Sequence, residues 1–277
     1  MAVELDFSGK VVLVIGGTSG INRGIAECFA AEGAKVAVAS RQRDKVDDTV
    51  AALQALGAEA MGFAADVRDA EALAAGVAQV HAAFGDFDVV VSGAAGNFPA
   101  LADQLSHNGF DAVVDIDLRG TFNAMKAVRP YLRSPGASVI NISAPQALMP
   151  MQAQLHVCAA KAGVDMITRT LALEWGGDGI RVNSIVPGPI DGTEGMARLA
   201  PSESIRARVA DSVPLKRMGT PADIGRACLF LGSELGAYVS GTVIPVDGGW
   251  AQNNCGGMGE ALGQVARQAA QARAAKP

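Results

Sequence analysis

Short apolar runs rich in valine, isoleucine and alanine alternate along the chain with longer segments in which apolar residues recur every three or four positions. The short runs are typical of buried strands, and the longer segments, such as GIAECFAAEG and PADIGRACLFLGSE, are typical of amphipathic helices. The alternation predicts right-handed βαβ units, and hence an α/β fold with a doubly wound (Rossmann), seven-stranded parallel sheet and helices on both faces. The predicted strands are residues 10–17, 35–40, 60–66, 87–94, 137–143, 181–188 and 243–249.

The chain length sets the domain organisation. Its 277 residues fit one large α/β domain, and a composition that is 49% apolar and 18% charged suits a buried parallel sheet. We expect a single domain over residues 1–250. Residues 251–277 turn Gly-rich and then Ala/Gln-rich without a further strand pattern, so we expect an extension there that is partly helical or disordered.

Charge and cysteine usage narrow the choice of partner. The net charge is −5 and no run of Lys and Arg is present, which disfavours nucleic acid and membrane surfaces and favours a small-molecule partner. The four cysteines lack CxxC spacing, which argues against a metal site and for a reducing compartment. The N-terminus has no signal-peptide pattern, and the C-terminal AKP is not a peroxisomal signal, so we expect a cytoplasmic location.

The first predicted strand runs into a glycine-rich turn that opens a helix, GGTSGINRGIA. Glycines in this context let the backbone turn tightly and bring the free N–H groups of a helix N-terminus against a pyrophosphate. We therefore expect dinucleotide binding by this turn. The predicted contacts are Gly16, Gly17, Thr18, Ser19, Gly20 and Ile21.

The end of the second strand indicates which dinucleotide binds. Ser40, Arg41 and Lys45 offer hydrogen-bond donors and positive charge where an acid would otherwise accept bonds from a free ribose. This favours NADP over NAD, although Arg41 also fits a solvated arginine at a strand end. Asp66, after the third strand, either accepts a bond from the adenine amine or caps the following helix.

Taken together, these segments resemble the short-chain dehydrogenase/reductase family over residues 8–250. The resemblance also rests on AADV (64–67), GAAG (93–96), Ser143, Lys161, RVNSIVPGPI (181–190) and DGG (247–249), in the family's order and spacing. It implies further cofactor contacts at Val67, Ala94, Ala95, Gly96, Lys161, Pro187, Gly188, Ile190 and Thr193, and it also places Ser184 near the nicotinamide. The chain has Asn22 at the family's third glycine and Ile15 at its usual threonine, which predicts weaker or shifted cofactor binding.

A larger departure concerns the catalytic tyrosine, which stands four residues before the lysine in ordinary members of the family. That position is Val157, which has no proton to donate. Tyr131 precedes the fifth strand and Tyr238 precedes the last strand, so neither replaces it. Ordinary alcohol or ketone chemistry is therefore disfavoured.

The family's active-site asparagine is replaced by Asp117. A helical projection places Asp117 on one face with Val113 and Thr121, whereas Asp115 and Arg119 lie on a polar stripe. We therefore expect Asp117 to point inward, either toward the chemistry or as a scaffold residue bonded to backbone or water.

The valine before the lysine, GAAGNF, DIDLRGTFN, HVCAAKAGVD and PGPIDGTEGMARL together resemble one subgroup of the family, the peroxisomal-type 2,4-dienoyl-CoA reductases. This resemblance implies reduction of a conjugated enoyl thioester by NADPH, with Lys161, Asp117 and Ser143 as catalytic residues. It implies that Lys161 holds the nicotinamide ribose and that Asp117 positions or acidifies a water. It also implies acyl-CoA contacts at Phe98, Ser106, Asn108 and Arg198.

Several alternatives remain open at this stage. Phe98 also fits loop packing, Asn108 a helix cap and Arg198 a solvated charge. His156 fits a packed residue or a proton carrier, and an inward Asp165 would be a second acid. The chain as a whole also fits a retired active site that binds a ligand or partner, or a reductase for another substrate. The family resemblance and two long apolar helices, around 108–132 and 151–175, imply a homo-oligomer, a tetramer.

Overall fold

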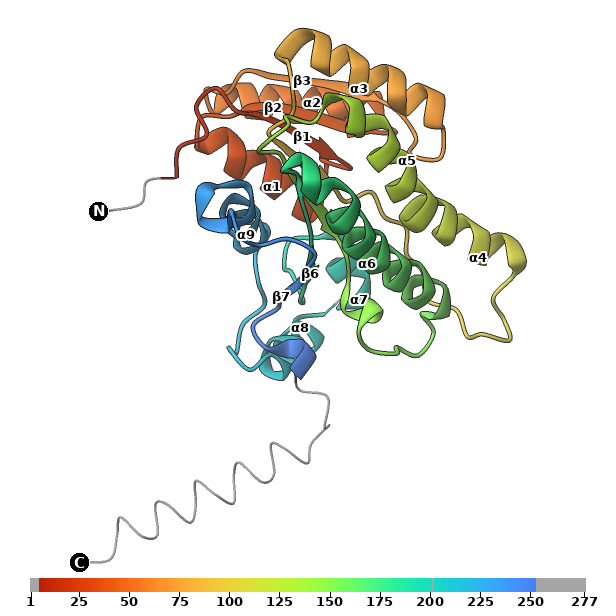
Figure 1. Cartoon of the computed structure of the whole chain (residues 1–277). Coiled ribbons are helices and arrows are strands. Elements are labelled where there is room, and N and C mark those ends of the chain that lie inside the picture. Colours follow the sequence, from red (N-terminus) through yellow and green to blue (C-terminus); the bar gives the residue numbers. More distant parts are fainter. Residues whose placement is uncertain (1–4, 201, 253–277) are drawn as a thin grey trace, which may run out of the picture.

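The computed structural model describes residues 5–200 and 202–252, without the side chains of residues 198 and 199. Within them, seven parallel strands form one sheet in the order β3-β2-β1-β4-β5-β6-β7, which confirms the predicted fold (Figure 1). The strands are β1 (Val11–Ile15), β2 (Lys35–Ser40), β3 (Ala60–Ala64), β4 (Val89–Ser92), β5 (Ser138–Ile142), β6 (Arg181–Pro187) and β7 (Val243–Val246). Each lies inside its predicted range, which also covered the turn residues at the strand ends.

Helices cover both faces of the sheet because alternate strand residues face opposite sides. In β1, Val12 and Val14 pack with α1 (Gly20–Ala31), α2 (Arg43–Ala55) and α9 (Pro221–Gly232). Leu13 and its alternate neighbours pack with α3 (Ala70–Phe84), α5 (Gly120–Val128) and α6 (Leu155–Trp175). Two separate apolar layers therefore hold the sheet rigidly between them.

The helix before β5 contains one wide turn. It begins as α4 (His107–Val114), passes through a π-helical turn over Asp115–Arg119, and continues as α5. The predicted helix over 108–132 is thus present, and the π turn carries Asp117 inward with 1% of its surface exposed. Single π turns inside α-helices often occur at functional sites.

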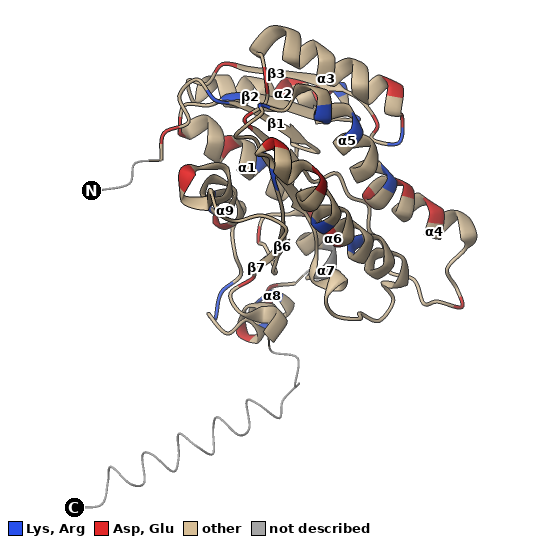
Figure 2. Ribbon diagram, in the orientation of Figure 1, with Lys and Arg blue, Asp and Glu red and all other residues tan. Residues whose placement is uncertain are grey.

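The segment after β6 forms the short helices α7 (Glu194–Leu199) and α8 (Glu203–Ser212), which lie beyond the carboxyl edge of the sheet (Figure 1). Basic and acidic residues lie interspersed over the described elements (Figure 2). No helix in residues 5–200 and 202–252 is long and apolar enough to cross a bilayer. The extension predicted from residue 251 lies, from residue 253 onward, outside the described residues.

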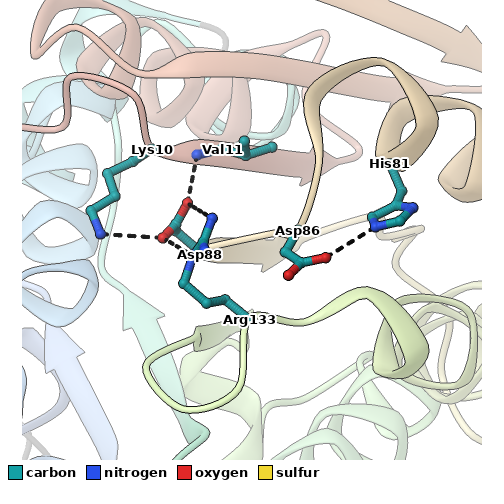
Figure 3. A network of polar contacts seen from close by, with 6 residues as sticks. All are labelled: Lys10, Val11, His81, Asp86, Asp88 and Arg133. Atoms are coloured by element: carbon teal, nitrogen blue, oxygen red, sulfur yellow. Dashed lines mark hydrogen bonds and ion pairs between the residues drawn. The ribbon is translucent and has the colours of Figure 1, made fainter.

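The amino edge of the sheet buries a carboxylate, Asp88, just before β4 (Figure 3). Its oxygens accept hydrogen bonds from the Arg133 guanidinium at 2.6 Å, the Lys10 ammonium at 3.2 Å and the Val11 N–H at 2.9 Å. These contacts tie β1, β4 and the segment before β5 together. The network is far from the carboxyl edge and fits a structural role.

Candidate active site

The glycine turn after β1 lies against the chain that follows β4. Gly16 has a φ of +82°, and a Cβ there would come within 2.7 Å of the Ala94 backbone nitrogen, so only glycine fits. Gly20 starts α1 with a φ of +51°. The N-cap Ser19 accepts no side-chain capping bond within the described chain, which leaves the N–H groups of the first helical turn available to a phosphate.

Gly17 has a different role from the one predicted. A Cβ on Gly17 would come within 2.7 Å of the Val14 carbonyl oxygen and 3.0 Å of the Val38 side chain. The residue therefore allows the turn to pack on β1 and β2 and does not line the cleft.

A hollow of about 380 Å³ lies beyond the ends of β2 and β3 and contains the residues predicted to bind the adenosine end of the cofactor. The buried Ser40 hydroxyl has no hydrogen-bond partner among the described residues. Arg41 is exposed beside it, and the Lys45 ammonium lies 3.7 Å from the Glu194 carboxylate on α7. The end of β2 therefore presents one hydroxyl without a partner and one exposed cation, whereas the second cation faces a carboxylate.

Asp66 lines the same hollow but does not cap a helix. Its two oxygens accept hydrogen bonds from the Arg68 guanidinium at 3.0 and 2.7 Å. These bonds are the main reason why the pKa of Asp66 lies below its usual value. The N-cap of α3 is Asp69, whose side chain accepts from the Ala72 N–H, so the capping alternative for Asp66 was wrong.

A second hollow of about 440 Å³ adjoins the first and shares with it Ser19, Asn22, Gly93, Ala95 and Glu194. The two therefore form one cleft along the carboxyl edge of the sheet. The first half is lined by the predicted residues Gly16, Thr18, Ser19, Ser40, Arg41, Lys45, Asp66, Val67, Ala94 and Ala95. The other half is lined by the predicted residues Gly20, Ile21, Gly96, Phe98, Asp117, Ser143, Lys161, Pro187, Gly188, Ile190 and Thr193.

Lys161 lies at the floor of the second half, on the second turn of α6. Its side chain is 6% exposed, and its ammonium donates a hydrogen bond to the Ile142 carbonyl oxygen at 3.0 Å. The same ammonium lies 3.3 Å from Oδ2 of Asp117. Because the carbonyl belongs to the end of β5, the charge is held at a fixed place at the carboxyl edge.

Asp117 reaches this place from the π turn. Its Oδ1 accepts a hydrogen bond from the Gly96 N–H at 2.7 Å, in the segment after β4. Its Oδ2 faces Lys161 as an ion pair without the geometry of a hydrogen bond. The predicted inward orientation is confirmed, and the contacts show that Asp117 supports the loop as well as facing the cleft.

Val157 stands one turn before Lys161, is 3% exposed and lines the cleft, so this position supplies no hydroxyl. Tyr131 stacks on the His81 ring, with centroids 4.5 Å apart, and Tyr238 is fully exposed. Neither tyrosine lines either half of the cleft. The sequence-based argument against tyrosine-dependent acid catalysis is confirmed in this respect.

Ser143 follows β5 and lines the cleft, and its buried hydroxyl oxygen has no hydrogen-bond partner among the residues described. Asp165, one turn after Lys161, is 2% exposed, as an inward orientation requires. Burial raises the pKa of Asp165. Ser184 itself is buried against Thr168 at 2.8 Å, so its predicted place in the cofactor lining was wrong.

Asn22 occupies the position of the family's third glycine without blocking the turn. Its side-chain amide donates a hydrogen bond to the Gly93 carbonyl oxygen at 2.7 Å. A Cβ on Gly93 would come within 2.3 Å of this side chain, so the glycine makes room for the asparagine. The substitution therefore ties α1 to the end of β4.

Only one of the described residues predicted to bind the acyl-CoA lines the cleft. Phe98 lines the cleft and packs on the His156 ring, with centroids 4.6 Å apart. Ser106 is the N-cap of α4 and accepts from the Gly109 N–H, so the cap assigned to Asn108 lies two residues earlier. Ser106 and Asn108 are exposed and lie outside the cleft lining, and the side chain of Arg198 lies outside the described part of the structure.

Sequence reasoning missed several polar residues in the cleft. Gln154 is 6% exposed, and its amide bonds to the carbonyl oxygens of Phe98 and Ala153. Glu194 lines both halves of the cleft and faces Lys45. Such side chains sit in loops or helix starts without periodic pattern, so no signal in the single sequence marks them.

Comparison with known proteins agrees with this geometry. The family model described as enoyl-(acyl carrier protein) reductase matches residues 16–251. A relative from Arabidopsis thaliana named peroxisomal 2,4-dienoyl-CoA reductase [(3E)-enoyl-CoA-producing] is 44% identical over 97% of this chain and 94% of its own length. A relative of the same name from Rattus norvegicus is 42% identical over 87% of this chain and 83% of its own length.

Solved structures of dehydrogenases have the same fold as this chain. A short-chain dehydrogenase from Bacillus anthracis is 36% identical, superimposes with a TM-score of 0.78, and covers 87% of this chain and 96% of its own. The dehydrogenase/reductase from Sinorhizobium meliloti 1021 is 28% identical with a TM-score of 0.83, over 89% of this chain and 97% of its own. From fold, cleft and relatives together, the chain belongs to the short-chain dehydrogenase/reductase family, whose fold binds a nicotinamide cofactor.

Proposed function

We propose that the protein is an NADPH-dependent reductase of conjugated enoyl thioesters of the 2,4-dienoyl-CoA type. The observation that carries the proposal is the buried Lys161–Asp117 pair, which faces a cleft where Val157 replaces the tyrosine. Such a site lacks the tyrosine that usually donates a proton to an alkoxide, but it keeps a cation and a carboxylate at its floor. The names of the relatives support the same substrate class.

The cofactor fits the residues of the cleft. The free helix N-terminus behind Gly16 and Gly20 suits the pyrophosphate, and the unpartnered Ser40 hydroxyl with Arg41 suits a 2′-phosphate. Lys161 would hold the nicotinamide ribose. When bound, NADPH supplies the hydride, and the chain supplies alignment and charge.

The chemistry that follows needs a proton on carbon. Hydride adds to the δ-carbon of the dienoyl thioester, the double bonds shift, and negative charge collects on the thioester oxygen. A proton then adds to the α-carbon, which leaves a 3-enoyl thioester. The Ser143 hydroxyl and the positive potential of Lys161 stabilise the charged oxygen, and Asp117 positions the water that delivers the proton.

The test is NADPH oxidation by the purified protein with 2,4-hexadienoyl-CoA beside a panel of simple ketones. We expect turnover with the thioester, little with ketones, and a 3-enoyl product by NMR. Binding of NADPH without turnover of any enoyl thioester would support a retired active site instead. Faster reduction of a ketone would assign the protein to another substrate class.

Cofactor choice is tested separately by comparing NADPH with NADH in the parent and in Arg41→Asp. We expect the parent to prefer NADPH, because Ser40 and Arg41 offer donors and charge to a 2′-phosphate. The Arg41→Asp variant should lose or reverse that preference. Equal binding of NADH by the parent would remove the argument from this strand end.

We also propose a homotetramer. Large apolar side chains are exposed on α5 and α6, namely Phe122, Leu155, Met166 and Leu173. Exposed apolar residues gathered on neighbouring helices are typical of subunit interfaces. Light scattering at micromolar concentration should give four times the mass of one chain, and a monomer would contradict the proposal. The cytoplasmic location stays a prediction, since the relatives named above are called peroxisomal.

A further inference from the structure

Lys45 and Glu194 form an ion pair in the first half of the cleft. Lys45 lies in the first turn of α2, and Glu194 is the first residue of α7. The Lys45 ammonium lies 3.7 Å from Oε1 of Glu194, and both side chains line the hollow beyond the ends of β2 and β3. The pair therefore joins two helices that are far apart in the sequence at the place where the 2′-phosphate of the cofactor is proposed to bind.

The two cations of this hollow differ in what surrounds them. Arg41 is exposed and forms no ion pair with a described residue, whereas Lys45 faces the Glu194 carboxylate. Both cations line the hollow. A phosphate that enters it would therefore meet one cation that has no acidic partner and one cation whose charge is already opposed by a carboxylate.

The start of α7 lies over the glycine turn. A Cβ built on Gly20 would lie 3.5 Å from the Thr193 methyl group, and Glu194 lines both halves of the cleft. The segment that carries α7 begins and ends at a backbone bridge between Ile190 and Gly219. Its base is thus held by backbone hydrogen bonds, whereas it reaches Lys45 through an ion pair between exposed side chains.

This ion pair is one that a bound phosphate can replace. The Lys45 and Glu194 side chains are 47% and 66% exposed, and ion pairs between exposed side chains are weak. Their separation of 3.7 Å also exceeds that of a charge-assisted hydrogen bond. A phosphate monoester carries about two negative charges near neutral pH, whereas a carboxylate carries one, so the phosphate attracts the ammonium more strongly.

We propose that Glu194 is a specificity-determining residue that competes with the 2′-phosphate of the cofactor for Lys45. Binding of NADPH replaces the carboxylate by the phosphate at the Lys45 ammonium, whereas binding of NADH leaves the ion pair in place. Glu194 therefore weakens the binding of NADPH and narrows the preference for NADPH over NADH. This inference rests on the proposed function, since it concerns the cofactor of that same reaction.

The experiment measures the Kd of NADPH and of NADH by fluorescence titration, without substrate, at about 50 mM salt, where surface charges are weakly screened. Glu194→Gln should bind NADPH about two- to fivefold more tightly than the parent, because an exposed ion pair no longer has to be broken. Its Kd for NADH should not change. Weaker binding of NADPH by Glu194→Gln, or an equal gain for both cofactors, would overturn the proposal.

Asp191→Asn is the matched control. It removes an exposed acid from the same segment, three residues before Glu194, and Asp191 lines neither half of the cleft. We expect this variant to keep the parent's ratio of NADPH to NADH affinity. The same gain in Asp191→Asn as in Glu194→Gln would mean that only the net charge of the segment matters, and this would contradict the proposal.

Double mutants decide whether Glu194 acts through Lys45. Lys45→Met and Arg41→Met should each weaken NADPH binding. The gain from Glu194→Gln should disappear in the Lys45→Met background and persist in the Arg41→Met background, because only coupled groups are non-additive. A gain of the same size in both backgrounds would mean that the carboxylate repels the phosphate directly, and NADPH binding that is unchanged in Lys45→Met would mean that Lys45 does not hold the phosphate. Either result would overturn the inference.

Failure of the proposed function gives a different result, because these titrations need no turnover. A parent that binds NADPH but reduces no enoyl thioester would contradict the proposed reaction and leave this inference standing. A parent that binds both cofactors equally would contradict the proposed preference, and the inference would still require Glu194→Gln to tighten the binding of NADPH alone. An unchanged ratio of NADPH to NADH affinity in Glu194→Gln would overturn the inference and leave the proposed reaction untouched.

Discussion

The amino and carboxyl edges of the sheet each bury an aspartate beside basic residues. The two aspartates differ in how many hydrogen bonds their carboxylate oxygens accept. Asp88 at the amino edge takes bonds from Arg133, Lys10 and the Val11 N–H (Figure 3). Asp117 at the carboxyl edge takes one backbone bond from Gly96 and faces Lys161 through its other oxygen. Both are nearly inaccessible, at 6% and 1% exposure.

The number of hydrogen bonds that a buried aspartate accepts distinguishes a structural aspartate from a functional one better than its exposed fraction does. The cations beside Asp88 are about half exposed, so that network is screened by solvent and closes on itself. Lys161 is 6% exposed, and the oxygen it faces has no aligned donor in the described chain. A carboxylate at a cleft that has an oxygen without a hydrogen-bond donor can still accept a bond from water or substrate.

The largest expected effect is on turnover. Asp117→Ala should lower kcat for dienoyl-CoA by about 10² to 10⁴ while NADPH binding stays nearly intact, because a positioned acid or base is lost. Stopped-flow rates and fluorescence titration of NADPH measure the two quantities. Asp111→Ala, an exposed acid on α4, is the control. If Asp117→Ala reduces the substrate as fast as the parent, Asp117 is scaffold only.

The second effect is on stability and belongs to the other edge. Asp88→Ala should lower the free energy of unfolding by about 2 kcal/mol, because the buried Val11 N–H loses its acceptor and two cations lose their partner. Urea denaturation gives this value, and kcat should stay within about twofold of the parent. A large loss of kcat with intact stability would mean that the contrast between the two edges is wrong.

A smaller effect concerns pH. The folded-state pKa of Asp165 lies above its unfolded value, so its contribution to stability is full below the unfolded pKa and is lost as pH rises through the folded pKa. Asparagine does not titrate. The melting temperature of Asp165→Asn should therefore rise relative to the parent as pH increases from about 4, and level off above the raised pKa.

The smallest expected effect is on ketone reduction. Val157→Tyr restores a hydroxyl four residues before Lys161, yet Asp117 still occupies the asparagine position and is paired with the lysine. We expect ketone reduction to stay near background in this variant, with Val157→Phe as the size-matched control. Strong ketone reduction by Val157→Tyr alone would show that the missing tyrosine is the only barrier to ordinary carbonyl chemistry.

The sheet could be predicted almost completely, because its strands are continuous apolar runs between turn residues and need no distant information. The inward face of Asp117 could be predicted from helical spacing for the same reason. The helix caps could not be predicted in this way. Asp66 and Asp69 are three residues apart and are equally suitable as the N-cap of α3. In the structure Asp69 is the N-cap, and Asp66 instead binds Arg68 in the loop. The Lys45–Glu194 pair joins residues far apart in sequence, and no local pattern encodes that meeting.

The π turn at Asp115–Arg119 has a consequence for aligning relatives. An α-helix advances by about 100° per residue, so removing one residue from this turn would swing every later side chain around the helix axis by that angle. An alignment gap placed one position away would then assign the acid to Ile116 or Leu118, and neither carries a carboxylate. Relatives that keep the wide turn can be expected to keep the register that brings an acid to the lysine, whatever the identity of the surrounding residues.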